Sequence, residues 1–325
     1  MDTTSPDDLP PDARVGVLLP RDLPAREVIP YARRADELGF SELWTVEDLG
    51  FRGGIAQASA VLAATARIRV GIGILPAASR NVAFAAMELA TLAELFPGRV
   101  DAGVGHGMPA WMRSVGAWPA SPLGLLTEYA TALRSLLRGE TVTSDGRYVR
   151  LDGVRLDAAP EVMPGILFGV RAPKSVALSG RLADGTILAE PVTPEYTAEV
   201  LAQIGAPSHR VVGYNIASVD VDESRALERA RPGLEWVGDP EWAPHIAPLP
   251  FADAFAALRQ ECGSRSEFIR RLPDEWVRRL AVAGTPASAR ERLAALHRSG
   301  ITDSVLLPVG SDPMRELGSL AALIP

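Results

Sequence analysis

Cysteine is almost absent from this sequence of 325 residues, since Cys262 is the only one. A single cysteine cannot form an internal disulfide, so we expect the fold to depend on its core and the protein to be cytoplasmic, in a reducing compartment. Histidine is nearly as scarce, and the four histidines lie far apart without the spacing of metal ligands. We therefore expect neither a disulfide scaffold nor a metal site.

Long hydrophobic runs and blocks of positive charge are also missing. No apolar run approaches the roughly 18 uninterrupted residues that a membrane-spanning helix needs. The net charge is −7, with acidic and basic residues interspersed, so the sequence lacks the basic stripe that binding a phosphate backbone demands. We expect neither nucleic acid nor a membrane as a partner.

The first fourteen residues hold three prolines and four aspartates but no apolar core. They predict a flexible tail over 1–14 rather than a signal peptide or an anchor. Over the whole chain 47% of the residues are apolar and 22% are charged, which is typical of a globular protein with a packed core. Residues 15–325 are expected to form that folded part.

What the sequence does contain is a regular alternation of short β-branched runs with amphipathic stretches. This alternation is typical of parallel βα units, and the number of units decides the architecture. The predicted strands cover 15–19, 42–46, 68–75, 99–104, 166–170, 185–189, 210–218 and 303–307. Eight strands favour a single α/β domain, a closed (β/α)8 barrel without a linker that divides it.

Helix boundaries are predicted at both ends of this pattern. Gly39 follows the first helix, where glycine can take the left-handed conformation that ends helices. Thr285 and Pro286 open the last helix before the eighth strand as an N-cap hydroxyl followed by proline, and Ser299 with Gly300 close it.

Two segments do not fit a plain barrel. Residues 139–157 carry an Asp145-Gly146 turn between alternating residues, which predicts a β-hairpin inserted before the fifth strand. In residues 232–250 proline and tryptophan recur, which indicates a long ordered loop or helical insertion before the eighth strand.

If the barrel is correct, chemistry belongs at the C-terminal ends of its strands and in the loops that follow. Glu47 and Asp48 come directly after the second strand. A carboxylate there could accept a hydrogen bond from a ring N–H, position a substrate or, with a pKa raised by burial, act as an acid. The alternative is a helix N-cap or a loop salt bridge.

A glycine-rich run, Gly103-Val-Gly105-His106-Gly107, ends the fourth strand. Glycines let a backbone approach a flat or phosphorylated ligand, although Met108-Pro109 interrupts the helix that a dinucleotide-binding motif would need. His106 could donate a proton, because imidazole titrates near neutrality; otherwise it is a hydrogen-bonding wall residue.

Positive charge follows the fifth strand, at Arg171 and Lys174. A helix beginning near Pro173 would add its N-terminal amides, so the segment suits a phosphate; the alternative is two solvated cations at a helix start. Arg52 and Arg80 also follow strand ends and could add positive potential, unless they are ordinary surface charges.

With these features in place, the sequence resembles the luciferase-like monooxygenase superfamily, in particular the branch similar to F420-dependent methylenetetrahydromethanopterin reductases. The resemblance covers about 15–190 and 284–310. It rests on the segments ADELGFSELWTVED, RIRVGIGILPAASRNVAFAAMELATLAELFPGRV, GVGHGMPAWM, GETVTSDGRYVRLD and GVRAPKSVALSGRLADG.

The resemblance implies a barrel that holds a flavin or deazaflavin ring at its C-terminal mouth, in a homodimer. The cofactor would be F420, or FMN as the alternative. The bond between Gly73 and Ile74 would be a non-prolyl cis peptide facing the ring. The implied cofactor-binding residues are Gly73, Ile74, Gly103, Gly105, His106 and Gly107 around the ring, and Gly169, Val170, Arg171, Pro173 and Lys174 at the phosphate.

The implied activity is that of an oxidoreductase: reduced F420 delivers a hydride to a C=N or activated C=C bond of a small-molecule substrate. Glu47, Asp48 or His106 would handle protons, while Trp111, Glu190 and Asn215 would contact the substrate. Alternatives are an FMN-dependent monooxygenase that uses O2, and a barrel that serves only as a binding scaffold.

Two departures from the family bear on the substrate. The sugar-phosphate dehydrogenases of the superfamily carry an Asp-His pair after the second strand, where this chain has Glu47 and Asp48. They also follow the glycine run with a glutamate, where this chain has Met108. We therefore do not expect sugar oxidation.

Overall fold

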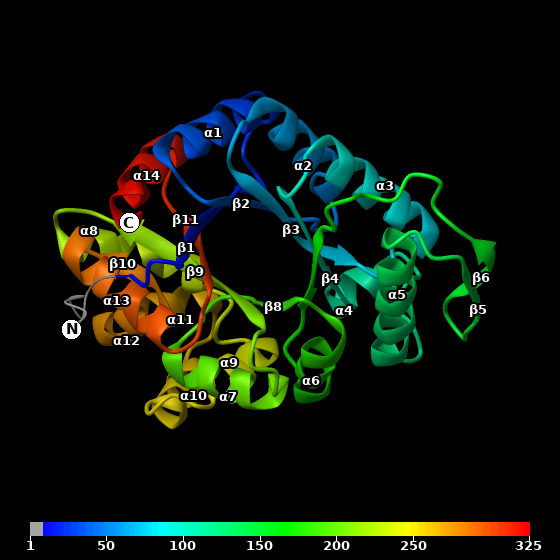
Figure 1. Ribbon diagram of the computed structural model, residues 1–325. Coiled ribbons are helices and arrows are strands. Elements are labelled where there is room, and N and C mark those ends of the chain that lie inside the picture. Colours follow the sequence, from blue (N-terminus) through cyan, green and yellow to red (C-terminus); the bar gives the residue numbers. More distant parts are fainter. Residues whose placement is uncertain (1–8) are drawn as a thin grey trace.

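Eight parallel strands close into a barrel at the centre of the computed structural model, which describes residues 9–325 (Figure 1). Around the barrel they run β1-β2-β3-β4-β7-β8-β9-β11, and β11 pairs with β1 to close the ring. Their bounds are β1 (Arg14–Leu18), β2 (Glu42–Thr45), β3 (Arg69–Pro76), β4 (Val100–Gly105), β7 (Gly165–Gly169), β8 (Gly185–Leu188), β9 (Arg210–Val219) and β11 (Asp303–Pro308). All eight predicted strands are confirmed.

Helices surround the barrel because each buries one apolar side against the strands (Figure 1). The outer ring consists of α1 (Ala25–Leu38), α2 (Gly54–Ala64), α3 (Val82–Leu95), α5 (Pro122–Leu137), α6 (Pro173–Leu182), α7 (Pro194–Ile204), α8 (Glu223–Ala230), α13 (Pro286–Arg298) and α14 (Pro313–Leu320), with η3 (Ala321–Leu323) after it. The short helix α4 (Pro109–Ser114) follows β4.

The predicted caps are confirmed. Gly39 ends α1 with φ +94°, and Thr285 accepts a hydrogen bond from the Ser288 amide at 3.3 Å at the start of α13. The predicted tail falls mostly on residues 1–8, which lie outside the described residues, and β1 begins at Arg14.

The predicted hairpin is confirmed as β5 (Val142–Asp145) and β6 (Arg150–Val154), which pair antiparallel. It projects from the barrel beside α5 (Figure 1). Glu128 of α5 holds it, because one carboxylate oxygen accepts from the amides of Tyr148 at 2.8 Å and Val149 at 2.9 Å.

The predicted loop and helical insertion before the last barrel strand is confirmed, and it extends well past residue 250. It holds η1 (Arg231–Leu234), η2 (Pro240–Trp242), α9 (Ala243–Ile246), α10 (Ala252–Glu261), α11 (Arg265–Arg271), α12 (Asp274–Leu280) and the strand β10 (Val282–Gly284). A second apolar core holds these elements together, with Leu234, Phe255 and Phe268 buried in it. β10 pairs with the end of β9, which extends past the barrel.

A cluster of buried charges closes the N-terminal end of the barrel. The carboxylates of Glu42, Asp101 and Asp303 are nearly inaccessible, and all three contact the Arg210 guanidinium. Arg69 adds a second cation, 2.9 Å from Asp101. Charged residues at this end of a barrel serve stability rather than chemistry.

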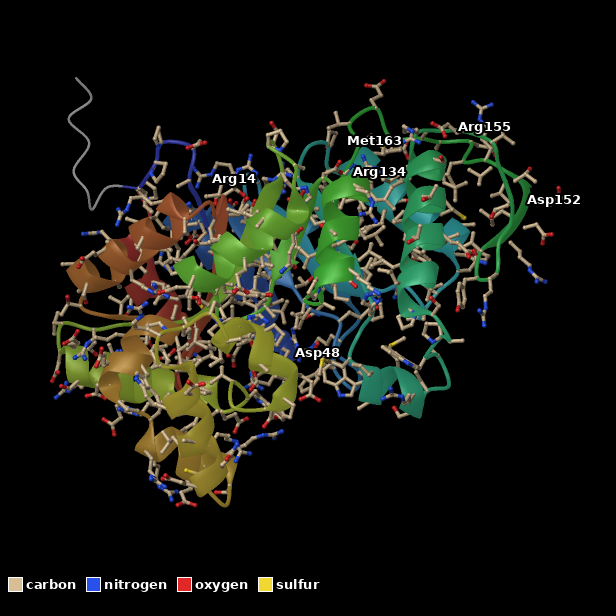
Figure 2. All side chains as sticks on the ribbon, turned by 90° about the horizontal axis from the view of Figure 1, so that it is seen from below. Arg14, Asp48, Arg134, Asp152, Arg155 and Met163 are labelled. Atoms are coloured by element: carbon tan, nitrogen blue, oxygen red, sulfur yellow. The ribbon has the colours of Figure 1, made fainter. Side chains whose placement is uncertain are left out.

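The opposite, C-terminal end is the mouth of the barrel. Figure 2 shows Asp48, which follows β2, on the side opposite to Arg14, the first residue of β1, and Met163, which precedes β7. The yellow segment that contains α9 and α10 lies on the same side as Asp48. Among the described residues, no helix is long and apolar enough to cross a membrane.

Candidate active site

The mouth has an apolar platform at Ile74. The Gly73–Ile74 bond is cis, as the resemblance implies. A Cβ at Gly103, Gly105 or Gly169 would lie within 3.0 Å of the Ile74 side chain. We predicted that glycines of this kind admit a ligand; in the structure those three make room for Ile74, which they hold in place.

Tyr214 lies beneath this platform. A Cβ on Gly73 would be 2.2 Å from its hydroxyl oxygen, and its ring packs edge-on against Trp44 at 5.8 Å between centroids. The hydroxyl is buried and has no hydrogen-bond partner among the described residues. Burial holds the pKa of Tyr214 well above its usual value, so the group stays protonated. Nothing in the strand pattern singled it out.

Glu47 is engaged in structural contacts. Arg80 binds both of its carboxylate oxygens, at 2.9 and 3.1 Å, and the Gly54 amide at the start of α2 donates to it at 2.9 Å. These are the cap and the salt bridge that the sequence left open as the alternative. Arg80 is likewise compensated, with Glu88 at 3.7 Å as a second partner.

Asp48 lies nearer to solvent at the mouth. It accepts a hydrogen bond from Arg21 at 2.7 Å, and that guanidinium sits 4.8 Å from the centroid of the Phe51 ring. Arg52 turns away from the mouth and donates to the carbonyls of Arg21 and Leu23, at 3.2 and 2.7 Å. It therefore fixes the β1–α1 loop rather than supplying free charge.

His106 joins the end of β4 to the first turn of α6. Its Nε2 lies 3.1 Å from the Ser175 hydroxyl. Burial lowers the pKa of His106 below its usual value, so the ring is neutral at pH 7 and suits hydrogen bonding better than acid catalysis. Gly107 next to it has φ +70°, and a Cβ there would meet the Met112 sulfur at 2.9 Å.

The first turn of α6 is open to an anion. Pro173 occupies its first position, and no side chain caps it, because Ala172 precedes it. Lys174 is exposed in this turn and is the only lysine in the sequence. The helix dipole and the ammonium group together attract negative charge to this end of the mouth.

Arg171 points toward the insertion instead. Its guanidinium carbon lies 4.4 Å from the centroid of the Trp242 ring, and among the described residues it makes no hydrogen bond. Trp242 in turn donates from its indole N–H to the Glu190 carbonyl at 2.8 Å. The insertion thus covers the ends of β7 and β8.

Glu190 is the carboxyl at the mouth whose pKa is raised. Burial raises that pKa, while the Arg171 charge opposes the shift. The bond from Glu190 to Pro191 is cis.

Asn215 fixes the residues that follow this bond, because its side-chain oxygen accepts from the Val192 amide at 3.0 Å. Asn215 therefore positions this segment. Trp111, the other predicted substrate-side residue, lies half-buried on α4.

Tyr196 and His245 form a buried pair next to Arg171 that the sequence did not reveal. Their ring centroids lie 4.2 Å apart with the planes tilted by 32°, and His245 Nδ1 lies 3.2 Å from the Pro191 carbonyl. The Tyr196 hydroxyl and His245 Nε2 have no partner among the described residues. Burial, helped by the Arg171 charge, lowers the pKa of His245 to about 3. Only the Pro- and Trp-rich composition around His245 hinted at an ordered contact.

These features define a class of protein. The barrel presents an apolar platform at the end of β3 and an anion-attracting helix start after β7, with a carboxyl of raised pKa beneath an insertion. Such a mouth suits a flat ring with a phosphate tail, which is the arrangement of a barrel enzyme that uses a ring cofactor.

Comparison with known proteins gives the family. The model of the luciferase-like monooxygenase family matches residues 9–303, and the chain belongs to that family. The 5,10-methylenetetrahydromethanopterin reductase of Methanolobus tindarius is 26% identical over 303 residues, which cover 88% of this chain and 92% of the relative.

Two solved structures share the fold. The coenzyme F420-dependent tetrahydromethanopterin reductase of Methanopyrus kandleri aligns with a TM-score of 0.81 at 19% identity, over 95% of this chain and 97% of that one. The oxygenating constituent of 3,6-diketocamphane monooxygenase from Pseudomonas putida, in complex with FMN, aligns at 0.71 and 15% identity, over 96% of both chains.

Proposed function

We propose that this protein is an F420-dependent reductase that transfers a hydride to a C=N or activated C=C bond of a small-molecule substrate. The observation that carries the proposal is the mouth: the Ile74 platform contacts Gly169 at the end of β7, just before the open turn of α6. The platform suits a flat ring and the open turn suits an anion. The similarity to a methylenetetrahydromethanopterin reductase along most of both chains supports F420 as the cofactor.

The residues that would hold the cofactor fall into two groups. Gly73 and Ile74 would face the ring, and Gly103 and Gly105 would act through Ile74. His106 and Gly107 would border the ring, while Gly169, Val170, Pro173 and Lys174 would surround the phosphate, with Arg171 on its substrate side. Reduced F420 supplies the hydride when bound, and the protein's part is to orient the substrate and exclude water.

Glu190 is the proposed proton donor. Glu47 is held by Arg80, Asp48 by Arg21, and neutral His106 by Ser175. Glu190 has no such side-chain partner within hydrogen-bonding distance among the described residues, and burial raises its pKa. A carboxyl whose pKa is raised holds its proton to higher pH than an ordinary carboxyl, so it can protonate the atom next to the one that accepts a hydride.

The test is turnover. Purified protein is mixed with reduced F420 and a panel of imines and enones without oxygen, and F420 oxidation is followed by its absorbance. We expect oxidation that depends on both protein and substrate. Substrate oxidation with reduced FMN and O2, and none with F420, would move the assignment to the monooxygenase, which the fold shared with an FMN-bound enzyme supports. If neither cofactor supports turnover, the remaining assignment is a barrel that serves only as a binding scaffold.

A homodimer through α2 and α3 belongs to the same proposal. The outer side of α3 exposes Phe84, Met87 and Leu95 to 65%, 52% and 64%. Beside it α2 exposes small residues, and a groove between the two helices is lined by Ala56 and Ser59. Large apolar side chains beside the small exposed residues of α2 fit a second copy related by a two-fold axis. Glu47, Arg80 and Glu88 also line the groove. Sedimentation should show a dimer that Met87→Glu weakens.

We also propose a cytoplasmic location. One cysteine in the whole chain fits a reducing compartment, and F420 or FMN would have to be available there. Fractionation of the source cells, followed by an antibody to the protein, checks this: the protein should stay with the soluble contents of the cytoplasm and not with secreted material.

A further inference from the structure

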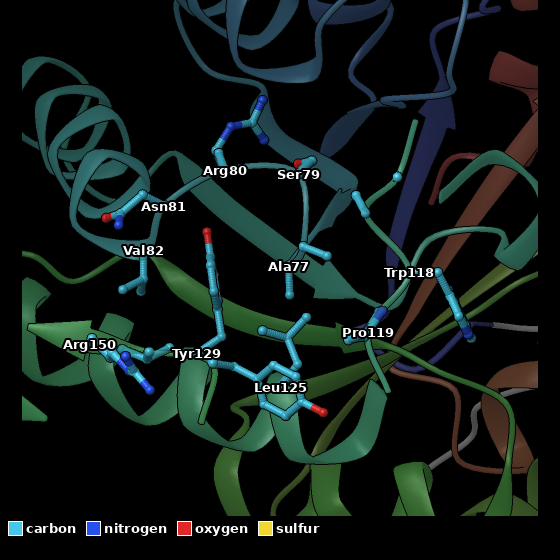
Figure 3. Close-up of a pocket in the computed structure, with 15 residues that line it drawn as sticks. Ala77, Ser79, Arg80, Asn81, Val82, Trp118, Pro119, Leu125, Tyr129 and Arg150 are labelled. Atoms are coloured by element: carbon cyan, nitrogen blue, oxygen red, sulfur yellow. The ribbon is translucent and has the colours of Figure 1, made fainter. Parts of the chain in front are cut away.

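A cavity of about 460 Å³ lies beside the mouth, outside the barrel (Figure 3). Its walls come from the loop after β3, the loop between α4 and α5, α5 itself and the β5–β6 hairpin. The volume is in the range of small-molecule sites. None of the roles proposed at the mouth needs it.

The hairpin wall is anchored in place. Glu128 accepts hydrogen bonds from two hairpin amides, and a Cβ on Gly146 would lie 2.4 Å from the same carboxylate oxygen. On the other side the Ser121 amide donates to the Tyr148 hydroxyl at 2.6 Å. The cavity therefore has a built frame instead of a loose edge.

Much of the lining is apolar and flat. Ala77, Val82 and Leu125 form part of it, and Trp118 and Pro119 border it at one side (Figure 3). A ligand also needs hydrogen-bond partners, and several polar groups of the lining already bond to other residues of the protein. The Trp118 ring offers an aromatic surface against which the ring of a planar ligand can pack.

Three polar side chains of the lining already have partners. Arg80 pairs with Glu47 and with Glu88, so it adds no net positive charge. The Asn81 side chain accepts from an amide of α3 at 2.8 Å, and the Ser79 hydroxyl donates to a carbonyl at 2.7 Å. Arg80 and Ser79 are committed to these contacts, while the Asn81 amide NH2 has no partner among the described residues and can still donate.

The polar groups that remain are donors. Tyr129 is only 3% exposed, and its hydroxyl has no hydrogen-bond partner among the described residues. In Figure 3 it points between Asn81 and Ala77. The Tyr148 hydroxyl already accepts a hydrogen bond, so its own proton is left to donate. Burial raises the pKa of Tyr129, which keeps that hydroxyl protonated.

Arg150 supplies the positive charge. Its side chain is 77% exposed, and its Nε lies 3.8 Å from an exposed Asp145 and 3.4 Å from the Gly146 carbonyl. Its two terminal nitrogens have no partner among the described residues. A ligand with an anionic group would find it at the edge of the cavity.

We propose that this cavity is a second binding site, for a small planar molecule with a mostly apolar body, oxygen acceptors and one anionic group: an aromatic carboxylate or sulfonate. The rings pack against Trp118 and the aliphatic wall. An oxygen accepts from Tyr129, and the anionic group faces Arg150. The site is separate from the mouth and does not depend on which cofactor the mouth holds.

The probe for the test is 8-anilinonaphthalene-1-sulfonate, a sulfonate on a planar naphthalene ring, whose fluorescence rises in apolar surroundings. It is titrated into the full-length protein with and without saturating F420. With F420 in the mouth we expect one probe bound per chain; without F420 the mouth, which suits a ring and an anion, can take a second. Absence of a site of that stoichiometry, or its loss on addition of F420, would overturn the proposal.

Three variants locate the site. Arg150→Glu should weaken probe binding about tenfold, and Tyr129→Phe several-fold, since a hydrogen bond to a charged group contributes about 1.5–3 kcal/mol and a neutral one about 1. Arg155→Glu is the matched control: it is exposed on the same hairpin and does not line the cavity. Circular dichroism checks that each variant is folded. Equal affinity in the Arg150 and Arg155 variants would place the probe elsewhere and contradict the proposal.

Discussion

The hydroxyl of Tyr214 occupies the space that any side chain on Gly73 would need, since a Cβ there would lie 2.2 Å from the hydroxyl oxygen. β3 and β9 thus meet directly below the platform. Gly73 is required by a tyrosine that lies far along the chain, and in residues 9–325 the hydroxyl of that tyrosine has no hydrogen-bond partner to fix it.

This relationship predicts a rescue. Gly73→Ala should lower the free energy of unfolding by about 1–3 kcal/mol, because it overpacks a buried site. Tyr214→Phe alone should cost less than about 1 kcal/mol, since the hydroxyl it removes has no partner. The double variant should recover part of the loss. Urea denaturation of the three variants measures this, and strictly additive effects would contradict the contact.

A second prediction concerns the proton donor. With Glu190 as the acid, turnover should fall as pH rises through its pKa, which burial raises above the usual carboxyl value. Glu190→Gln should lower kcat by about 10²–10⁴ and remove that alkaline limb. The control is Asp48→Asn, which removes a mouth carboxylate that Arg21 already neutralises. An unchanged pH profile in Glu190→Gln would show that another group supplies the proton.

The third prediction uses the single lysine. Because Lys174 is the only one in the chain, an amine-specific reagent modifies that side chain and the N-terminal amine alone. If Lys174 lies at the phosphate, F420 should slow its modification several-fold, while the N-terminus reacts as before and serves as the internal control. Peptide mass spectrometry reads both sites. Equal rates at Lys174 with and without F420 would remove it from the cofactor site.

The fourth prediction is a pH dependence of stability at the closed end of the barrel. Burial, together with the charge of Asp303, raises the pKa of Glu42 to about 8, against the opposing charge of Arg210. The folded protein then binds this proton more tightly than the unfolded chain does. The contribution of Glu42 to the free energy of unfolding is fully present below pH 4.5 and is lost as pH rises through about 8.

Glu42→Gln should flatten that slope, which for one proton is at most about 1.4 kcal/mol per pH unit. Denaturation at several pH values between these limits measures it. Glu37→Gln, on the exposed side of α1, is the control and should leave the slope unchanged. The same slope in the wild type and in Glu42→Gln would mean that Glu42 is charged in the folded state.

The fold was predictable because its pattern is local. Runs such as 68–75 and 99–104 carry the β-branched composition of buried parallel strands, and Thr285 with Pro286 marks a helix start in any context. The hairpin turn at Asp145-Gly146 is similarly local. The cis bond at Gly73 came from the resemblance, since no local pattern predicts it.

The site was less predictable because its contacts join distant segments. Strand ends indicated where Glu47 lies, but Arg80 is 33 positions away, and only the folded barrel shows that the pair is closed. The same holds for Arg171 and Trp242, whose contact crosses from β7 to the insertion. The sequence indicated which residues lie at the rim of the mouth. The structure showed the partner of each residue, and those partners decide which residue is free to act.

The most direct test of the central claim is a binding titration of the purified protein, freed of any cofactor, with F420 and with FMN, each followed by fluorescence. Micromolar binding of F420 with much weaker binding of FMN is the predicted result, and Lys174→Glu should weaken it while Arg155→Glu leaves it unchanged. Tight FMN binding with no measurable affinity for F420 would contradict the account.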